Sequence, residues 1–254
     1  MHIESLYRYP VKGLTPEPLA SAALTPGRCI PWDRAFALAQ GGAALNPANP
    51  AWVSKTNFMC LLRNASIALL QTRFDEAASQ LSITAPNGQS IAANPLTPEG
   101  RAALGAFLTT WLGAQARTSP LGQPPVFHYA PSHSLCDHHT QVISLIGLGS
   151  LRALEAAAAA PRDKHRFRAN IHIENIAPWS EFTWLGRTLQ IGEVTLRVRE
   201  RIGRCAATTV NPATALRDAN PVRELQKNLG HTDLGIYAEV LTPGLIRPGD
   251  TITL

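Results

Sequence analysis

A cysteine at position 205 lies among residues that favour its reactive form. The run Val194–Arg199 alternates apolar and polar residues, which is typical of a half-buried strand, and a turn with Gly203 and Arg204 follows it. Arginines at positions 199, 201 and 204 are sequence neighbours of Cys205. Nearby positive charge favours the thiolate, which acts as a nucleophile or as a ligand of a soft metal. The alternative, that Cys205 is a small buried apolar residue, stays open at this point because that is the usual fate of a free cysteine.

Basic residues elsewhere in the chain could bind an anionic ligand. Lys12 and Gly13 lie in a loop punctuated by prolines, and Arg34 follows Asp33 at the start of a predicted strand. A lone lysine is most often exposed, and an Asp-Arg step is often only a local salt bridge. Neither position therefore defines a site by itself.

Arg168 and Asn170 form a more specific pair. Alternation along the predicted strand 170–174 places both side chains on one face, where a guanidinium could hold a phosphate and an amide could hold the edge of a ring. Ser150 follows Gly149 at the predicted start of a helix, whose free backbone amides could bind an anion. Simple capping of that helix by Ser150 is the common alternative.

A histidine-rich loop, residues 133–139, invites a zinc interpretation because it contains three histidines and one cysteine. Structural zinc sites usually take pairs of ligands from two elements, and the sequence has no second pair. We therefore expect this loop not to bind a metal.

The order of several segments resembles a known family. A Gly-Arg-Cys step at 203–205 is combined with three further segments, namely Arg166–Ile171, Leu189–Val194 and Thr208–Pro212. This series is similar to the MOSC domain, which is named for the C-terminal part of molybdenum cofactor sulfurases. At the other end, Tyr9–Gly13 and Trp32–Phe36 resemble the β-rich N-terminal module that accompanies this domain in the amidoxime-reducing component and its bacterial relatives.

The resemblance implies that the chain binds a molybdenum cofactor, a pterin with a phosphate and a dithiolene that holds the metal. It implies that Cys205 is the catalytic residue and the protein ligand of molybdenum. The residues that it implies for binding the cofactor are Lys12, Gly13, Arg34, Ser150, Arg168, Asn170, Arg204 and Tyr237. Asp137 also matches an aspartate of the family.

The activity that the resemblance implies is the reduction of small N-hydroxylated or N-oxygenated compounds. The sequence contains no G-x-G-x-x-G, no flavin motif and no four-cysteine iron-sulfur pattern, so we expect a separate electron donor, either a ferredoxin-like protein or a flavin reductase. Two alternatives remain. One is a molybdenum cofactor carrier or sulfur-transfer module that uses Cys205, and the other is a thiol enzyme with a Cys-His pair.

Composition narrows the class of protein. The 254 residues are 45% hydrophobic and 16% charged, which is ordinary for a folded globular chain. A net charge of +5 favours anionic ligands, but no basic stripe interleaved with aromatic residues indicates nucleic-acid binding. Four widely spaced cysteines make a disulfide framework unexpected and favour a reducing compartment. With no signal peptide and no apolar run long enough to span a membrane, we expect a cytoplasmic protein that makes no membrane contact.

The predicted fold is mainly β (α+β). Many short strands and only three predicted helices favour a β-barrel with peripheral helices. The resemblance makes this a MOSC-type barrel packed against a β-rich N-terminal module, with a division into residues 1–120 and 121–254. The best-defined helix begins after Thr97 with Pro98 and ends at Gly113. Segments 66–70, 81–84, 234–240 and 244–254 are among the predicted strands.

Overall fold

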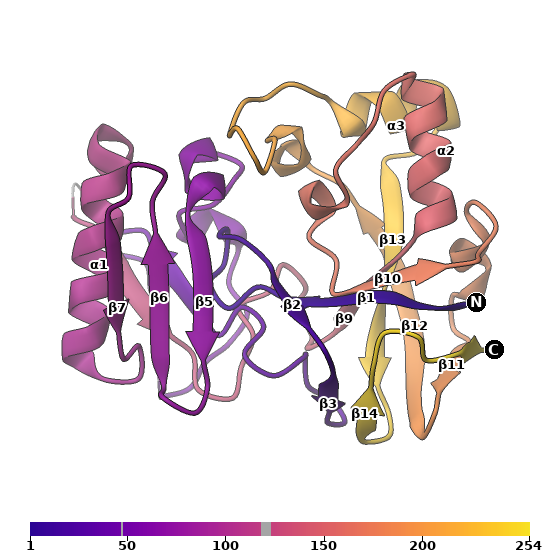
Figure 1. Cartoon of the computed structure of the whole chain (residues 1–254), viewed down its shortest axis with the longest axis horizontal. Coiled ribbons are helices and arrows are strands. Elements are labelled where there is room, and N and C mark those ends of the chain that lie inside the picture. The colour runs from indigo at the N-terminus through magenta and orange to yellow at the C-terminus, as the bar shows by residue number, and fades with distance from the viewer. Residues whose placement is uncertain (47, 118–122) are drawn as a thin grey trace.

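An eight-stranded sheet built from both ends of the chain forms the larger of two lobes (Figure 1). It is described from a computed structural model, which covers residues 1–46, 48–117 and 123–254. The strands follow one another across the sheet in the order β15 (Ile252–Thr253), β11 (Thr188–Ile191), β12 (Val194–Gly203), β13 (Asp233–Val240), β9 (Ile143–Gly147), β10 (Ile171–Glu174), β1 (His2–Arg8) and β2 (Glu17–Leu19). Neighbours are antiparallel except β9 and β10, because helix α2 (Leu148–Ala158) connects those two strands as a crossover.

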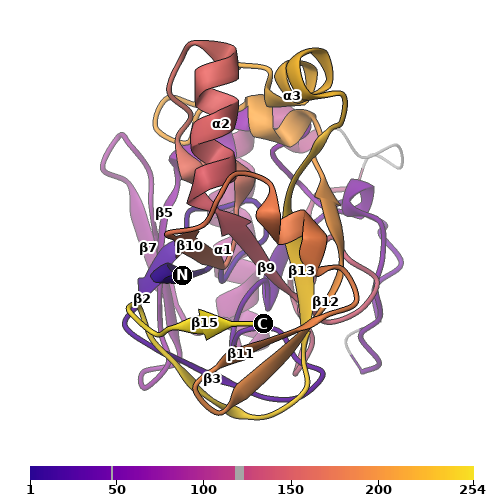
Figure 2. The ribbon, with the colours of Figure 1, turned by 90° about the vertical axis from the view of Figure 1, so that its right-hand side faces the viewer.

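The sheet curls until its two ends meet. The amide of Ile3 donates to the carbonyl of Asp250 at 3.0 Å, and the amide of Ile252 donates to the carbonyl of Met1 at 3.0 Å. Strand β1 thus lies beside the segment that leads into β15, and the two chain ends lie close together in both ribbon views (Figures 1 and 2). The predicted mainly β, barrel-like architecture is confirmed.

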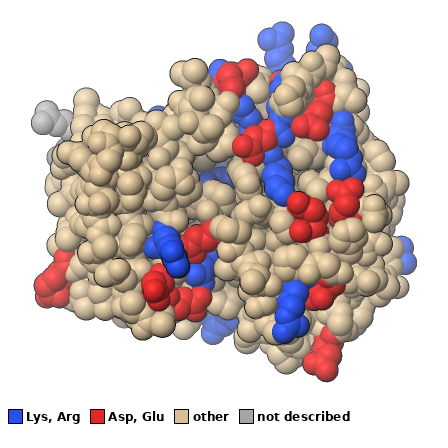
Figure 3. Space-filling model, in the orientation of Figure 1, with Lys and Arg blue, Asp and Glu red and all other residues tan. Residues whose placement is uncertain are grey.

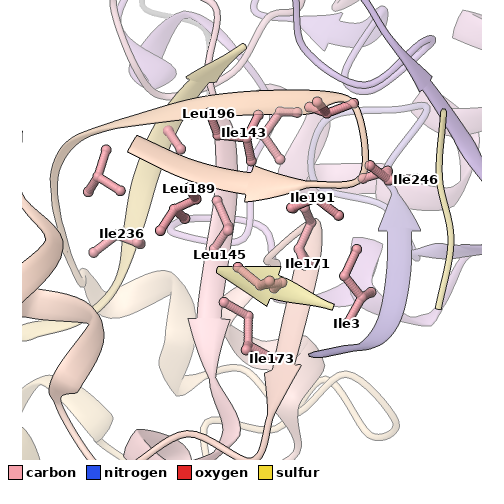
Figure 4. Packing of buried hydrophobic residues seen from close by; sticks show 14 of the residues in the cluster. Ile3, Ile143, Leu145, Ile171, Ile173, Leu189, Ile191, Leu196, Ile236 and Ile246 are labelled. Atoms are coloured by element: carbon pink, nitrogen blue, oxygen red, sulfur yellow. The ribbon is translucent and has the colours of Figure 1, made fainter. Parts of the chain in front are cut away.

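Apolar side chains that alternate along these strands fill the interior of the barrel (Figure 4). In β12, Val194, Leu196 and Val198 are buried whereas the residues between them are not, as the sequence pattern predicts. The pairing of β12 with β13 shifts register after Val198 and again after Arg201. Such bulges redirect side chains. They occur on the stretch that leads to Cys205.

The smaller lobe has its own core. Strands β5 (Gln71–Asp75), β6 (Gln80–Thr84) and β7 (Ser90–Ala93) form an antiparallel sheet, and helix α1 (Pro98–Leu112) packs beside it (Figure 1). Its buried residues include Leu70, Leu81, Leu104 and Leu108. Strand β4 (Phe36–Ala39) pairs with β8 (Val126–Tyr129), and β3 (Ala22–Leu24) pairs with β14 (Gly244–Ile246).

Short helices connect these elements. Helix α3 (Pro221–Leu229) packs beside α2. The remaining helical turns are of the 3-10 type: η1 (Lys55–Asn57), η2 (Ala65–Leu69), η3 (Gly113–Arg117), η4 (Lys164–Phe167), η5 (Ser180–Trp184) and η6 (Ala206–Thr209). Across the residues that the structure describes, no helix has both the length and the apolar character needed to cross a bilayer.

The capping signals of the sequence set the helix ends. The hydroxyl of Thr97 accepts from the amide of Gly100 at 3.0 Å, Pro98 occupies the first turn, and Gly113 ends α1 with a φ of +52°. This helix was predicted with the bounds that the structure has. Helix α3 likewise ends at Gly230, whose φ is +76°.

Two strand predictions are wrong. Residues 66–70 are not a strand but mostly belong to η2, because a helical turn lets the neighbouring Ile67 and Ala68 both face the core of the smaller lobe. A strand would point them to opposite faces. Residues 244–254 form two short strands, β14 and β15, since the carboxylate of Asp250 accepts from the amide of Arg247 at 2.7 Å and closes a turn between them.

The proposed division of the sequence stays a prediction, and its boundary at 120 and 121 lies outside the described residues. In space, the first residues do not stay with the smaller lobe. Strands β1 and β2 belong to the eight-stranded sheet, and β3 pairs with β14. The chain therefore crosses between the lobes more than once.

A buried histidine makes the barrel sensitive to acid. The ring of His172 on β10 is fully buried; its Nδ1 lies 3.1 Å from the hydroxyl of Ser5, and its Nε2 has no hydrogen-bond partner among the described residues. Burial lowers the pKa of His172 to about 3, and the nearby Lys164 and His165 act in the same direction. The folded state thus binds fewer protons than the unfolded state between pH about 6.5 and about 3.

We predict that the free energy of unfolding falls as the pH decreases through this window, and that His172→Gln weakens the dependence. The substitution removes the group that must be protonated on unfolding. Urea unfolding at a series of pH values measures both effects. His2→Gln, at a partly exposed histidine on the neighbouring strand β1, is the control and should keep the parental slope. If His172→Gln also keeps the parental slope, His172 does not cause the acid sensitivity.

Candidate functional site

A cavity of about 520 Å³ is lined by residues of both lobes, and it contains eight of the nine predicted site residues. These eight are Lys12, Gly13, Arg34, Arg168, Asn170, Arg204, Cys205 and Tyr237. They come from five separate parts of the sequence. The fold therefore brings the residues of the resemblance to one place.

The ninth residue, Ser150, lies elsewhere. Its hydroxyl is fully buried in the first turn of α2, where it donates to Glu181 at 2.8 Å and accepts from the amide of Trp179 at 2.7 Å. Helix α2 begins three residues earlier than predicted, so its N-cap is Gly147 and Ser150 does not cap it. The carboxyl group of Glu181 lies against this helix start, within 3.1 Å of where a Cβ on Gly147 would be. That carboxyl takes the place that an anionic ligand would need.

Positive charge dominates the wall of the cavity. Seven cationic side chains line it against three carboxylates: Lys12, Arg34, Lys55, Arg166, Arg168, Arg201 and Arg204 against Asp33, Asp137 and Glu200. On the molecular face shown in Figure 3, basic and acidic side chains gather mainly over the larger lobe, and the upper part of the smaller lobe is almost free of charge. The imbalance inside the cavity favours an anionic ligand.

Two arginines sandwich a buried tyrosine at the base of this site. The guanidinium carbons of Arg34 and Arg168 lie 4.4 and 4.2 Å from the ring centroid of Tyr9. Arg34 also pairs with Asp33 at 2.5 Å and donates to the carbonyl of Arg168 at 2.8 Å. Burial alone would lower the pKa of Arg34, but Asp33 raises it above its usual value. Arg34 is therefore locally neutralised and acts as a support for Arg168.

Arg168 has no such carboxylate. One terminal nitrogen donates to the carbonyl of Leu14 at 2.7 Å, and the other, Nη2, is buried without a hydrogen-bond partner in the described ranges. Burial and, next, the charge of Arg34 lower the pKa of Arg168 to about 10, so the guanidinium remains charged at neutral pH. A buried cation with a free N–H group is a strong indication of a missing anionic partner.

The backbone at Arg168 differs from the predicted strand. Its φ and ψ are +53° and +39°, and β10 begins only at Ile171, so strand alternation does not align Arg168 with Asn170. Both still line the cavity. The amide oxygen of Asn170 accepts from the amide and the hydroxyl of Ser144 at 3.1 and 2.8 Å, and its nitrogen donates to Tyr7 O at 3.1 Å. Asn170 thus connects β9 and β1 as well as facing the cavity.

Arg204 is held by main-chain oxygens. Its Nε donates to the carbonyl of Leu234 and its Nη1 donates to the carbonyl of Phe167, both at 2.8 Å. Burial lowers its pKa to about 10. Gly235, with a φ of +82°, makes this approach possible, because a Cβ there would lie 2.4 Å from Leu145 O and 3.3 Å from Nη2 of Arg204.

Lys12 and Gly13, which follow strand β1, also line the cavity. The ammonium of Lys12 donates to the carbonyl of Leu135 at 2.7 Å and pairs with Asp137. Burial alone would raise the pKa of Asp137, but Lys12 lowers it below its usual value. Gly13 has a φ of +90°, and a Cβ there would lie 2.7 Å from Ile67. A side chain at this position would therefore disturb both the turn and the packing.

Cys205 lies at the end of β12, as predicted, in an extended conformation before η6. The β-branched residues after it do not form a strand, because the hydroxyls of Thr208 and Thr209 donate to the carbonyls three residues earlier and stabilise the turn. The ammonium of Lys55 donates to the sulfur of Cys205 at 3.4 Å. Although burial opposes it, the charge of Cys205 raises the pKa of Lys55.

Two features of the cavity leave no pattern in the sequence, namely Lys55 and the contribution of the histidine-rich loop. No motif surrounds Lys55 in the sequence. The loop forms part of the cavity wall through Cys136, Asp137, His138 and His139. The ring of His138 lies 5.0 Å from that of Tyr237, and its Nε2 is 2.7 Å from Glu200. Only the family match of Asp137 pointed to this loop.

The loop was predicted to be free of metal. Within residues 1–46, 48–117 and 123–254, no group of three or more histidine, cysteine or acidic side chains is arranged to hold a metal ion. That finding concerns sites built from several protein ligands. A cofactor that brings its own ligands and takes one thiolate from the protein is a different case.

Family models match nearly the whole chain. The MOSC domain matches residues 125–253, and the MOSC N-terminal beta barrel domain matches residues 1–115. The chain belongs to the MOSC family. The resemblance inferred from the motifs around Cys205 and Lys12 is thereby confirmed. Membership links the chain to activities related to the molybdenum cofactor.

Other comparisons are more distant. The YuaD protein of Bacillus subtilis is 13% identical over 99% of this chain and 93% of its own, with a TM-score of 0.44. YiiM from Geobacillus stearothermophilus is 20% identical over 44% of this chain and 53% of its own, with a TM-score of 0.35. No curated protein matches the chain.

We predict that the cavity binds inorganic pyrophosphate and that Arg168→Gln weakens binding by about 10- to 100-fold. Losing a charge-assisted hydrogen bond costs about 1.5–3 kcal/mol, which corresponds to this change in the dissociation constant. Isothermal titration of the purified protein measures it, and urea unfolding shows whether the variant is folded. Arg187→Gln makes the same change at an exposed site outside the cavity and should bind like the parent. Equal affinity of parent and Arg168→Gln would contradict the assignment.

Proposed function

We propose that the cavity binds the molybdenum cofactor and that the protein is a molybdenum-dependent oxidoreductase. The observation that carries this proposal is Arg168, a buried cation with a free N–H group and no carboxylate against it among the described side chains. Arg204 is also bound by carbonyls alone in the contacts that the structure describes. Two half-buried guanidiniums without acidic partners, one of them with a buried and unpaired Nη2, would be costly unless a bound anion compensated them.

The residues of the cavity fit this cofactor. Lys12, Arg34 and Arg168 would hold its phosphate, and Arg204 would face its anionic portion. Cys205 presents a sulfur to the same cavity, and a thiolate is a suitable donor for a soft metal. The volume of about 520 Å³ lies within the range of cofactor pockets.

When bound, the cofactor would supply two-electron redox chemistry at molybdenum. The protein supplies binding, orientation and charge. Arg168 and Arg204 would hold the anionic part of the ligand, and the ammonium of Lys55 donates to the sulfur of Cys205 at 3.4 Å. Another part of the wall consists of His138, which contacts Glu200, and of Tyr237, whose ring lies beside that of His138. The substrates that we propose are small N-hydroxylated or N-oxygenated compounds, which would be reduced.

Electrons would come from a separate protein. The 254 residues contain neither a nicotinamide nor a flavin motif, and their four cysteines do not form an iron-sulfur pattern. We therefore include a ferredoxin-like protein or a flavin reductase in the proposal.

One observation also favours a second function, that of a cofactor carrier or sulfur-transfer module. The contact between Lys55 and Cys205 would stabilise a persulfide on Cys205 as well as a thiolate. Turnover separates the two functions. A carrier would bind the cofactor but would not support repeated reduction of a substrate.

We predict that Cys205→Ser keeps the pterin but loses reductase activity in protein produced in a host that makes the cofactor. The phosphate keeps its cationic partners, whereas a hard hydroxyl replaces the soft donor with little change in volume. Pterin content, molybdenum content, the absorption spectrum and amidoxime reduction are measured together. Cys29→Ser, a buried thiol that does not line this cavity, should retain the parental spectrum and activity. Parental activity in Cys205→Ser would show that Cys205 is not the metal ligand.

A second prediction concerns the source of electrons. The purified protein with bound cofactor should not reduce an amidoxime when a nicotinamide cofactor is the only reductant, but it should do so with reduced methyl viologen. The reason is the absence from the sequence of a motif that binds nicotinamide or flavin. Product formation under the two conditions is followed by chromatography. Turnover with the nicotinamide alone would disprove the need for a separate donor.

A further inference from the structure

Cys136, in the wall of the cavity, lies beside Cys29, a cysteine that is far from it in the sequence. Cys29 precedes β4 and is 8% exposed, and Cys136 is half-buried in the histidine-rich loop between β8 and β9. The two thiols are close enough for each to shift the pKa of the other. Both are free thiols in the structure. Their separation of more than 100 residues explains why no spacing motif revealed the pair.

The surrounding backbone holds the two thiols in place. The S–H of Cys29 also faces the carbonyl of Val142 at 3.1 Å, and the sulfur of Cys136 lies 3.4 Å from the carbonyl of His138. The amide of Leu135 donates to the carbonyl of Arg34 at 2.8 Å, which ties the loop to the segment that follows Cys29. The pair is therefore part of a fixed contact between two elements.

The two thiols are not equivalent. The hydrogen bond from Cys29 lowers the pKa of Cys136 to about 6, and the charges of Lys12 and Arg34 contribute in the same direction. The same contact, together with burial, raises the pKa of Cys29 well above its usual value. A reactive thiolate thus lies against a protonated thiol.

Access to the pair is also unequal. Cys136 lines the cavity of about 520 Å³, so a small molecule that enters this cavity reaches its sulfur. Cys29 lines a second cavity, of about 360 Å³, and Asp33 belongs to the walls of both. An attacking Cys136 that a small oxidant can reach, next to the more buried Cys29, is the arrangement of a reactive and a resolving cysteine.

We propose that Cys29 and Cys136 form a dithiol that small peroxides oxidise reversibly to a disulfide. The thiolate of Cys136 attacks one oxygen of hydrogen peroxide; the S–O bond forms, the O–O bond breaks, and the leaving hydroxide takes a proton to become water. The sulfur of Cys29 then attacks the sulfur of Cys136; the S–S bond forms and the S–O bond breaks. The hydroxyl leaves with the proton of Cys29 as a second water. Peroxide gains the two electrons that the two thiols lose, and a thiol reductant reverses the change.

The disulfide would change the cofactor cavity in two ways. It would join the histidine-rich loop, which supplies Asp137 to Lys12, to the segment that supplies Arg34. It would also remove a thiolate from beside two of the cations that face an anionic ligand. The inference does not depend on the identity of the cofactor, because the chemistry takes place between protein groups and peroxide.

The test uses the reduced, purified protein without cofactor. It is treated with a small excess of hydrogen peroxide near neutral pH, and the free thiols are blocked. Peptides are then mapped by mass spectrometry under non-reducing conditions. We expect a peptide pair linked through Cys29 and Cys136, the loss of two thiols per chain, and recovery of both thiols with dithiothreitol. A disulfide between Cys136 and either Cys60 or Cys205, or a Cys136 that stays reduced while Cys205 is oxidised, would overturn the proposal.

Single substitutions assign the two roles. In Cys29→Ser, Cys136 should be oxidised and stop at the sulfenic acid, which dimedone traps. In Cys136→Ser, Cys29 should stay reduced. Cys60→Ser, a matched change at another buried thiol that lines the cavity, should form the disulfide like the parent. Equal oxidation of Cys29 in Cys136→Ser would also contradict the assignment, and the mapping of the parent decides the question if a variant fails to fold.

Discussion

Burial of arginine side chains without carboxylate partners is the constraint around which this site is built. Removing a guanidinium from water costs several kcal/mol unless its charge and its N–H groups are compensated. Here the compensation is incomplete. The ring of Tyr9 separates Arg34 from Arg168. Carbonyl oxygens accept one hydrogen bond from the guanidinium of Arg168 and three from that of Arg204. What remains is a deficit of negative charge inside the cavity, which a bound phosphate would remove.

The architecture provides the rigid supports that such a site requires. The amide of Lys12 donates to the carbonyl of Phe36 on β4, and the amide of Arg34 donates to the carbonyl of Tyr9, directly after β1. Arg204 and Cys205 lie at the end of β12, after two register shifts that redirect the strand. Strand β1 is a member of the larger sheet, and a bridge between Val11 and Phe36 connects the segment after it to β4.

Much of the fold and most of the site could be predicted from local patterns. Alternation located β12, the strand predicted at 234–240 is β13, and the cap at Thr97 located α1. The motifs around Arg168 and Cys205 located the cavity, because those residues and their spacing belong together in the family. Ser150 was expected to bind the cofactor but does not line the cavity. The buried carboxyl of Glu181 occupies the start of helix α2, where the prediction placed a ligand.

What could not be predicted depends on contacts between distant segments. Lys55 meets Cys205 only because a loop of the smaller lobe reaches across the cavity, and Cys29 meets Cys136 through the pairing of β4 with β8 and the loop after it. Neither contact leaves a periodic or motif-like trace in the sequence. The strand predicted for residues 66–70 is wrong for a related reason. Two adjacent apolar residues face one core, and only the tertiary structure defines that core.

The closure of the barrel by β1 also has a consequence for the order of folding. His2 pairs with Glu174 across two strands, and the amide of Ile3 donates a hydrogen bond to the carbonyl of Asp250. The partners in these contacts are separated by most of the chain, so forming them closes long loops. Strands β5, β6 and β7, in contrast, pair with their neighbours in sequence, and α1 follows directly. Closing long loops costs entropy before any contact repays it. The smaller lobe can therefore nucleate locally, while barrel closure, and with it the alignment of Lys12 opposite Cys205, belongs to the late steps of folding.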